Sequence, residues 1–257
     1  IIITYQNNLF VIEVKAGSFP STPPITDFEA HTKAYRKLAE MADSQCSRTV
    51  EYIANHSPAQ FYDHEKNPTF SLPNLDTFDD VFTFSVTVDN FNEFAAKAEK
   101  LSIISLKEET VVISYDDLLA YADYFDAPIW FLHYLKQRKA AMRVPQYQMN
   151  DELDHLGLYI DRNLYALDPS QYGDVEKVVW KGFRKPLDEY FNLRFANPSE
   201  AKKPTQNMPN QISEIIEYLG SSISPEKIRF AHYLMDLASD AREELADKIE
   251  YAFRRQR

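Results

Sequence analysis

The alternation of apolar and polar positions near the start of the chain predicts a β-hairpin. Residues 1–5 and 9–16 are rich in β-branched and aromatic side chains, and the polar residues 6–8 between them favour a turn. Because side chains alternate across a strand, Glu13 and Lys15 share one face of the second strand. Burying a charge is costly unless it is paired or used. This otherwise apolar strand is therefore the first place to look for chemistry.

Residues 27–55 change to a period of three and four, which predicts a helix capped by Asp27. Gln45 belongs both to the inner face and to an adjacent stripe, so it is expected at the edge of the buried surface. The inner face comprises Leu38, Ala42, Gln45, Thr49 and Ile53, and the stripe comprises Met41, Gln45, Arg48 and Tyr52.

The middle of the chain alternates between strand and helix patterns. Residues 59–80 are irregular, 81–88 and 111–113 predict strands, and a short helix is expected from residue 89 or 90 to 101. Ser114 and Asp117 resemble a capping box for a helix through Phe125, and Asp126 with Pro128 predicts the start of another helix ending near Met142.

These patterns predict an α/β core over residues 1–142, with a mixed sheet flanked by helices. Residues 143–257 are expected to form a mostly helical C-terminal region, with only helices and linkers after residue 175 and a last helix over 225–254. The polar stretch 197–209, with three prolines, predicts a linker. The C-terminal region is a candidate surface for a protein partner or a second copy of the chain.

Composition narrows the function classes. The chain has 257 residues with 44% hydrophobic residues, which fits a globular protein with a real core. We see no apolar run of transmembrane length and no signal peptide, and the single cysteine, Cys46, favours a reducing, cytoplasmic location. A net charge of −11 counts against broad non-specific nucleic-acid binding, although a local basic groove or a metal-dependent site stays open.

The strand Val11-Ile12-Glu13-Val14-Lys15-Ala16, followed by a helix carrying Gln45 and Tyr52, resembles the PD-(D/E)xK nuclease superfamily. This superfamily has the restriction-endonuclease-like fold, and the similarity points to a nuclease-related or RecB-like branch. The resemblance covers roughly the first 60 residues, and loosely the strand near Phe84.

The resemblance implies a divalent-metal-dependent endonuclease that hydrolyses phosphodiester bonds, with DNA favoured over RNA. It implies Mg²⁺ or Mn²⁺ bound by the carboxylate of Glu13 and the backbone carbonyl of Val14. Lys15 would orient the attacking water and stabilise developing charge, and Gln45 would hold substrate or the metal-bound water by hydrogen bonding.

The sequence departs from this family pattern at one position. The family carries an aspartate at or just before the preceding strand, whereas residues 1–12 contain no Asp or Glu. We expect the chain to be a fragment whose aspartate lies before Ile1. Asp27 could substitute, although helix capping explains it. Two alternatives stay open: a catalytically inactive nuclease-like fold that binds nucleic acid or protein, and a surface ion pair between Glu13 and Lys15 on an edge strand.

Other polar residues have simpler explanations. Residues 151–155 (Asp-Glu-Leu-Asp-His) could bind a metal, but are expected to be a solvated turn with acids at a helix start. His133 is expected to be a packed helix residue and Cys46 a small buried group. The arginine-rich end, 254–257, could touch nucleic acid but is typical of a solvated tail.

Overall fold

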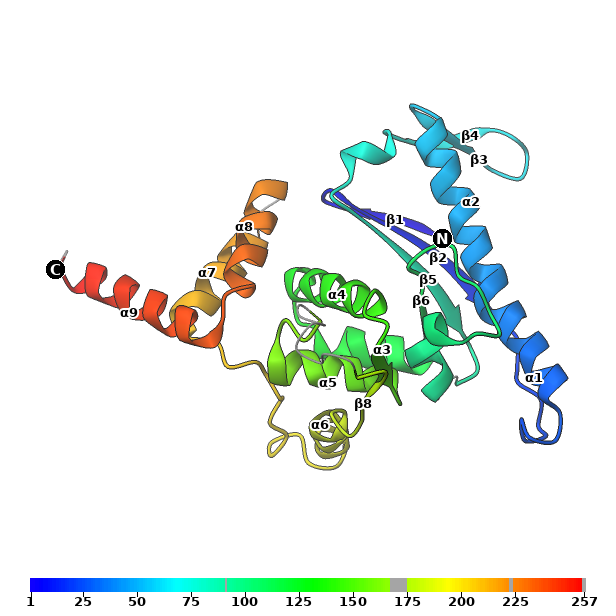
Figure 1. Ribbon diagram of the computed structural model, residues 1–257. Helices are drawn as coiled ribbons and strands as arrows, with labels where there is room; N and C mark the ends of the chain where they lie inside the picture. The colour runs from blue at the N-terminus through cyan, green and yellow to red at the C-terminus, as the bar shows by residue number, and fades with distance from the viewer. Residues whose placement is uncertain (91, 167–174, 222–223, 256–257) are drawn as a thin grey trace. The chain divides into compact units, whose positions relative to one another are not determined.

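The computed structural model describes residues 1–90, 92–166, 175–221 and 224–255 (Figure 1). The chain divides into two compact units, Ile1–Leu119 and Ala120–Arg257. The sequence predicts the boundary at residue 142, whereas the division lies after Leu119, within the helix Tyr115–Tyr124.

Unit 1 is built on a four-stranded mixed sheet, as the sequence predicts. Its strands are β1 (Ile2–Tyr5), β2 (Asn8–Lys15), β5 (Asp80–Thr87) and β6 (Val111–Ser114), in the order β1-β2-β5-β6. β1 and β2 form the expected antiparallel hairpin, whereas β2, β5 and β6 are parallel to one another. The carboxyl ends of these three strands therefore meet at one edge of the sheet.

The two faces of β2 have different neighbours. On one face Phe10 stacks against Phe82, with ring centroids 5.3 Å apart. On the other face Leu9 and Val11 are buried in a cluster with Cys46 of the following helix. Glu13 continues this second face towards the carboxyl end of the strand, which places its carboxylate on the helix-covered side of the sheet.

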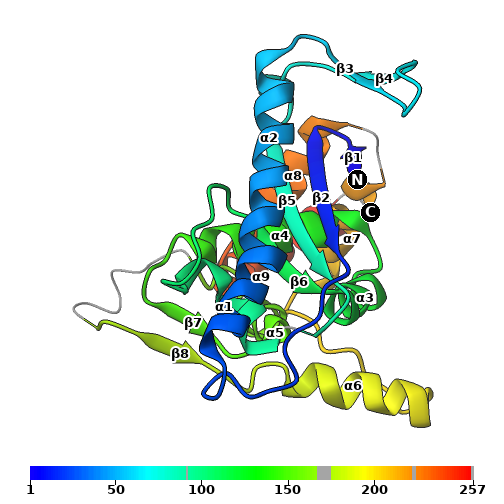
Figure 2. The ribbon, with the colours of Figure 1, turned by 90° about the vertical axis from the view of Figure 1, so that its right-hand side faces the viewer.

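The predicted helix over residues 27–55 is confirmed, with one irregular stretch. It consists of α1 (Phe28–Tyr35), a π-helical segment η1 (Arg36–Glu40) and α2 (Met41–Asn55). Asp27 caps it as expected, because its side chain accepts a hydrogen bond of 3.0 Å from the Ala30 amide. α2 runs along the sheet and packs on β2 and β5 (Figures 1 and 2).

Residues 59–80, expected to be irregular, contain a second small sheet. β3 (Ala59–Tyr62) and β4 (Pro68–Leu72) form an antiparallel hairpin beyond the carboxyl end of α2 (Figure 2), followed by the 3₁₀ turn η2 (Leu75–Thr77). Hydrogen bonds from the Glu65 and Asn67 amides to the Asp63 carboxylate, both 2.9 Å, hold the turn of this hairpin.

The short helix expected to end at residue 101 is not an α-helix. Asn92–Lys100 forms 3₁₀ turns (η3), interrupted at Lys97, which has the non-helical angles φ −137° and ψ 22°. By contrast, the capping box at Ser114 is confirmed. Its hydroxyl donates to the Asp117 carboxylate at 2.7 Å and accepts from the Asp117 amide at 3.1 Å, which starts α3 (Tyr115–Tyr124).

Unit 2 is mostly helical among its described residues. Its helices are α4 (Pro128–Met142), α5 (Glu152–Arg162), α6 (Lys185–Ala196), α7 (Asn210–Gly220), α8 (Pro225–Met235) and α9 (Ser239–Arg255). A helical start at Pro128 is confirmed, but Ala127 occupies the cap position and Asp126 pairs with Lys203 instead, at 2.6 Å. Residues 198–209 carry no helix or strand, in keeping with the expected linker.

Two expectations for unit 2 are wrong. β8 (Val178–Trp180) pairs in parallel with β7 (Tyr147–Met149), so the chain after residue 175 is not purely helical. The last helix is also broken, between α8 and α9. The Asn163 amide and the Arg242 guanidinium both donate to the Met235 carbonyl, and these tertiary partners satisfy the helix end where α8 stops.

Candidate functional site

The structure brings Glu13, Lys15 and Gln45 together. The Lys15 ammonium donates a hydrogen bond to the Gln45 side-chain oxygen and lies 3.6 Å from the Glu13 carboxylate. The Lys15 and Glu13 side chains are 17% and 28% exposed, so both are mostly covered yet reachable from solvent. The three residues that the sequence resemblance selects are therefore one cluster, contributed by β2 and α2.

Local packing explains why Gln45 faces Lys15. The next residue, Cys46, is fully buried and its thiol donates to the carbonyls of Val11 and Phe84, each at 3.6 Å. These contacts hold α2 against β2 and β5 at this level. Gln45 consequently lies at the edge of the buried helix face, as its place in both helical stripes predicts.

A groove opens beside this cluster. It has a volume of about 530 Å³ and is lined by Glu13, Gln45, Arg48, Thr49, Tyr52, Gln60, Phe61 and Tyr62. A second hollow of about 360 Å³, lined by Arg36, Glu40, Met41, Ser44, Gln45 and Arg48, shares two of these residues. The predicted stripe along α2 is thus the wall of a groove that contains both arginine and carboxylate side chains.

The burial of Glu13 and Lys15 bears on one alternative. At these two residues β2 pairs with β5, and both side chains are mostly buried on the face that α2 covers. Glu13 also borders a groove, so the two side chains do not form an ion pair that points into open solvent. A partly covered charge pair that opens into a groove can contact a ligand.

The carboxylate of Glu13 and the backbone carbonyls beside it are oxygen atoms of the kind that hard cations bind. The Ile12 carbonyl accepts a hydrogen bond of 2.8 Å from the Ile1 amine, so it points towards β1. Val14 lies two residues further along the same strand, so its carbonyl points to the same side as that of Ile12. Carboxylate and carbonyl oxygens are ligands that Mg²⁺ and Mn²⁺ accept, but these two fill only part of a six-oxygen shell. Among the described residues, no group of three or more His, Cys, Asp or Glu side chains could hold a metal ion.

Two other acids of unit 1, Asp27 and Asp43, already have hydrogen-bond partners. Asp27 uses one carboxylate oxygen to cap α1. Asp43, a buried acid on α2, accepts hydrogen bonds from the amides of Lys107 and Glu108 and from the Thr110 hydroxyl, which fixes the chain before β6.

The acidic cluster at residues 151–155 is buried rather than solvated, so the expected solvated turn is wrong. The expected helix start is confirmed, since Asp151 caps α5 through the Leu153 amide at 2.9 Å. Glu152 is fully buried and accepts from Arg138 at 2.9 and 3.1 Å and from the Tyr121 hydroxyl at 2.8 Å.

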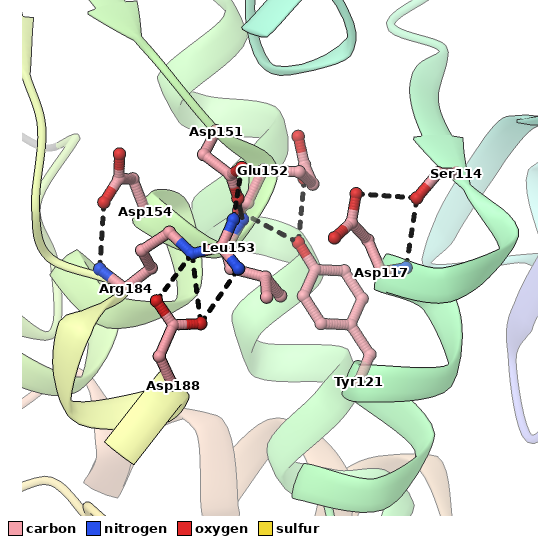
Figure 3. Close-up of polar contacts among 9 residues, drawn as sticks. All are labelled: Ser114, Asp117, Tyr121, Asp151, Glu152, Leu153, Asp154, Arg184 and Asp188. Atoms are coloured by element: carbon pink, nitrogen blue, oxygen red, sulfur yellow. Dashed lines mark hydrogen bonds and ion pairs between the residues drawn. The ribbon is translucent and has the colours of Figure 1, made fainter. Parts of the chain in front are cut away.

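Asp154 belongs to the same buried cluster. It accepts a hydrogen bond of 2.9 Å from the Arg184 amide, and burial raises the pKa of its carboxyl (Figure 3). The acids of this cluster are thus engaged by protein partners, and its arrangement is that of a structural network.

The remaining candidates behave as packing residues. Burial, followed by the carboxylates of Glu13 and Asp43, raises the pKa of the Cys46 thiol to about 12, so Cys46 is a buried structural group. His133 is buried in α4 between the Tyr159 hydroxyl at 2.7 Å and Asp236 at 2.9 Å. Arg254 pairs with Glu250 on the exposed surface of α9, and residues 256–257 lie outside the described residues.

Sequence reasoning missed Gln60, Phe61 and Tyr62, which line the groove from β3. The missed signal is a short alternation on either side of the turn formed by residues 63–67. Phe61 pairs with Phe70 across the hairpin, and the two rings stack with centroids 4.7 Å apart.

Comparison with protein-family models, curated proteins and solved structures finds no match. Among the described residues, no helix is long and apolar enough to cross a membrane.

Proposed function

We propose that unit 1 is a divalent-metal-dependent nuclease domain of the restriction-endonuclease-like fold, hydrolysing phosphodiester bonds in DNA. One observation carries this proposal. The ammonium of Lys15 lies between the Glu13 carboxylate and the Gln45 amide, beside an open groove. The three residues come from sequence positions that the resemblance selects without any knowledge of the fold.

The order of elements supports the same proposal. An antiparallel hairpin carries the Glu-x-Lys unit on its second strand, a helix carries the glutamine, and the next strand of the sheet lies parallel to the second. This topology is what the restriction-endonuclease-like resemblance implies. The carboxyl end of β2, where Glu13 and Lys15 lie, is also the edge at which β5 and β6 end.

Each residue has a role in this reaction. Glu13 and the Val14 carbonyl would hold a hard cation such as Mg²⁺ or Mn²⁺, which lowers the pKa of bound water and offsets charge on the phosphate. The Lys15 ammonium stabilises negative charge on the phosphoryl oxygens. Gln45 holds the lysine in place, and its amide N–H₂ group can donate to a phosphate oxygen.

A second candidate function uses the same groove without cleavage. In the described chain Glu13 is the single carboxylate that lines the groove of about 530 Å³. This favours an inactive nuclease-like module that binds nucleic acid or protein. Binding that survives while no metal stimulates cleavage would identify this second function.

Cleavage of a labelled oligonucleotide at matched Mg²⁺, Mn²⁺ and EDTA concentrations tests the first proposal. The unaltered chain should cleave with metal and not with EDTA. Glu13→Gln should lower the rate by about a hundredfold or more, since it removes a ligand charge.

The control for this experiment is Glu29→Gln, which removes an exposed carboxylate from the first turn of α1 and should cleave like the parent. Equal rates for Glu13→Gln and Glu29→Gln, or no metal-dependent cleavage by the parent, would contradict a catalytic role.

A further inference from the structure

The β3–β4 hairpin carries aromatic side chains that face solvent. Tyr62 is 58% exposed and Phe70 is 44% exposed. Phe61 lies flat against Phe70, with planes 8° apart, and the Tyr52 ring contacts Phe61 edge-on at 5.5 Å. The edge-on contact from α2 supports the stacked pair from behind. A supported aromatic ring that is partly exposed can stack with another flat group.

An irregularity in the hairpin aims two consecutive residues at the groove. In a regular strand, Phe61 and Tyr62 would lie on opposite faces. The pairing register shifts between these two residues, and both line the groove that also contains Glu13. Bulges of this kind re-aim side chains next to functional sites. Phe61 and Tyr62 of the hairpin therefore line the same groove as Glu13 and Gln45 of the candidate catalytic cluster.

The charges along the groove are few. Arg48 is exposed between the two hollows, and Arg36 lines the more distant one. Glu13, Glu40 and a chain net charge of −11 oppose a dense row of phosphates. A duplex presents two closely spaced phosphate rows and hides its base faces, whereas a single strand has lower charge density and can stack bases on aromatic rings.

We propose that this groove binds single-stranded nucleic acid. Bases stack on Tyr62 of the groove wall and on Phe70, which stacks on the groove residue Phe61, and Arg48 contacts the backbone between the hairpin and Glu13. The inference rests on the proposed nuclease function and defines its substrate as single-stranded. Base recognition by stacking is tolerant of sequence, because every base has a flat face.

Fluorescence anisotropy in EDTA tests binding without cleavage. The probes are a 15-nucleotide labelled oligothymidylate and a 15-base-pair duplex. The unaltered chain should bind the single strand at least about tenfold more tightly. Tyr62→Ala should weaken that binding by about fivefold or more, since a stacked base contributes about 1–3 kcal/mol. The affinity should fall with salt at a logarithmic slope of about −0.7, which corresponds to the one contact between Arg48 and a phosphate.

Two control variants separate stacking from general damage. Tyr62→Phe keeps the ring and should bind like the parent. Tyr233→Ala removes a tyrosine of similar exposure, 63%, from α8 and should also bind like the parent. Equal affinity for strand and duplex, or unchanged binding by Tyr62→Ala, would overturn the inference.

The outcomes distinguish this inference from the proposed nuclease activity. Selective single-strand binding without metal-dependent cleavage would support binding in the groove and refute catalysis. Metal-dependent cleavage that Tyr62→Ala leaves unchanged on both probes would support catalysis and refute single-strand binding in the groove. A parent chain that binds neither probe would overturn the inference as well.

Discussion

Glu13 in unit 1 and Glu152 in unit 2 are both mostly buried acids beside a basic side chain, but their surroundings differ. Glu152 is fully buried and accepts two hydrogen bonds from Arg138 and one from Tyr121. Glu13 is 28% exposed, lies 3.6 Å from Lys15 and borders a groove.

The difference separates a structural charge pair from a candidate reactive one. A buried acid with several donors has its charge satisfied within the fold, and losing a donor destabilises the protein. A partly exposed acid with a long contact keeps lone pairs available for a ligand. The sequence favoured a solvated turn for the Glu152 cluster, whereas its burial and its hydrogen bonds from Arg138 and Tyr121 identify it as structural.

The chain contains a separate probe for each unit. The single cysteine lies in unit 1, and both tryptophans, Trp130 and Trp180, lie in unit 2. The reactivity of the Cys46 thiol therefore reports on the packing of unit 1, and tryptophan fluorescence reports on the unfolding of unit 2.

The largest expected effect is on the reactivity of Cys46. Because the thiol is fully buried and its pKa is raised to about 12, very little thiolate is present at pH 8. Reaction with a disulfide reagent should be slower in the native chain than in the chemically unfolded chain by about a thousandfold or more. A native rate within tenfold of the unfolded rate would show that α2 does not stay packed on β2.

The next effect concerns the Arg138–Glu152 pair. Arg138→Met leaves a fully buried carboxylate without its cation, so unit 2 should lose about 3–5 kcal/mol of unfolding free energy. Urea denaturation followed by tryptophan fluorescence measures this loss. Arg194→Met, which breaks a half-exposed pair with Asp123, should change stability by less than about 1 kcal/mol. If both variants lowered the unfolding free energy by the same small amount, the buried cluster would not have the structural role assigned to it.

A smaller effect is expected from pH. Burial, then the charges of Lys136 and His133, lowers the pKa of His232 to about 3, and burial also lowers the pKa of His133. The unfolded chain therefore binds more protons than the folded chain between pH 6.5 and about 3. The contribution of these two histidines to the unfolding free energy is therefore full above pH 6.5 and decreases as the pH falls towards about 3.

The variant His232→Asn isolates one of these groups. Its unfolding free energy should fall with decreasing pH less steeply than the parent's, by up to about 1.4 kcal/mol per pH unit. Urea midpoints at several pH values between 4 and 7 give the two slopes. Identical slopes would show that His232 titrates normally in the folded chain.

Local signals predicted the elements around the candidate site well. The hairpin, the helix cap at Asp27 and the Ser114 capping box follow from short-range residue patterns, and each is present. The position of Gln45 also follows, because helical periodicity places it at the edge of the buried face. These features depend on residues close together in the sequence.

Tertiary contacts decided what the sequence did not reveal. The burial of residues 151–155 depends on Arg138 and Arg184, which are distant in the sequence, and the break between α8 and α9 depends on Asn163 and Arg242. The β3–β4 strands are short, and their polar turn disguised the alternation. No local pattern encodes such partners.

The most direct test of the catalytic proposal is Lys15→Ala compared with Lys33→Ala. Lys15 contacts both Glu13 and Gln45, whereas Lys33 is an exposed lysine in the last turn of α1. Single-turnover cleavage of a labelled single-stranded oligonucleotide with Mg²⁺ should slow by about a hundredfold or more for Lys15→Ala and stay at the parental rate for Lys33→Ala. Slow reaction of the Cys46 thiol would show that the Lys15→Ala variant is folded. Cleavage at the parental rate by this folded variant would contradict the assignment of the cluster as the active site.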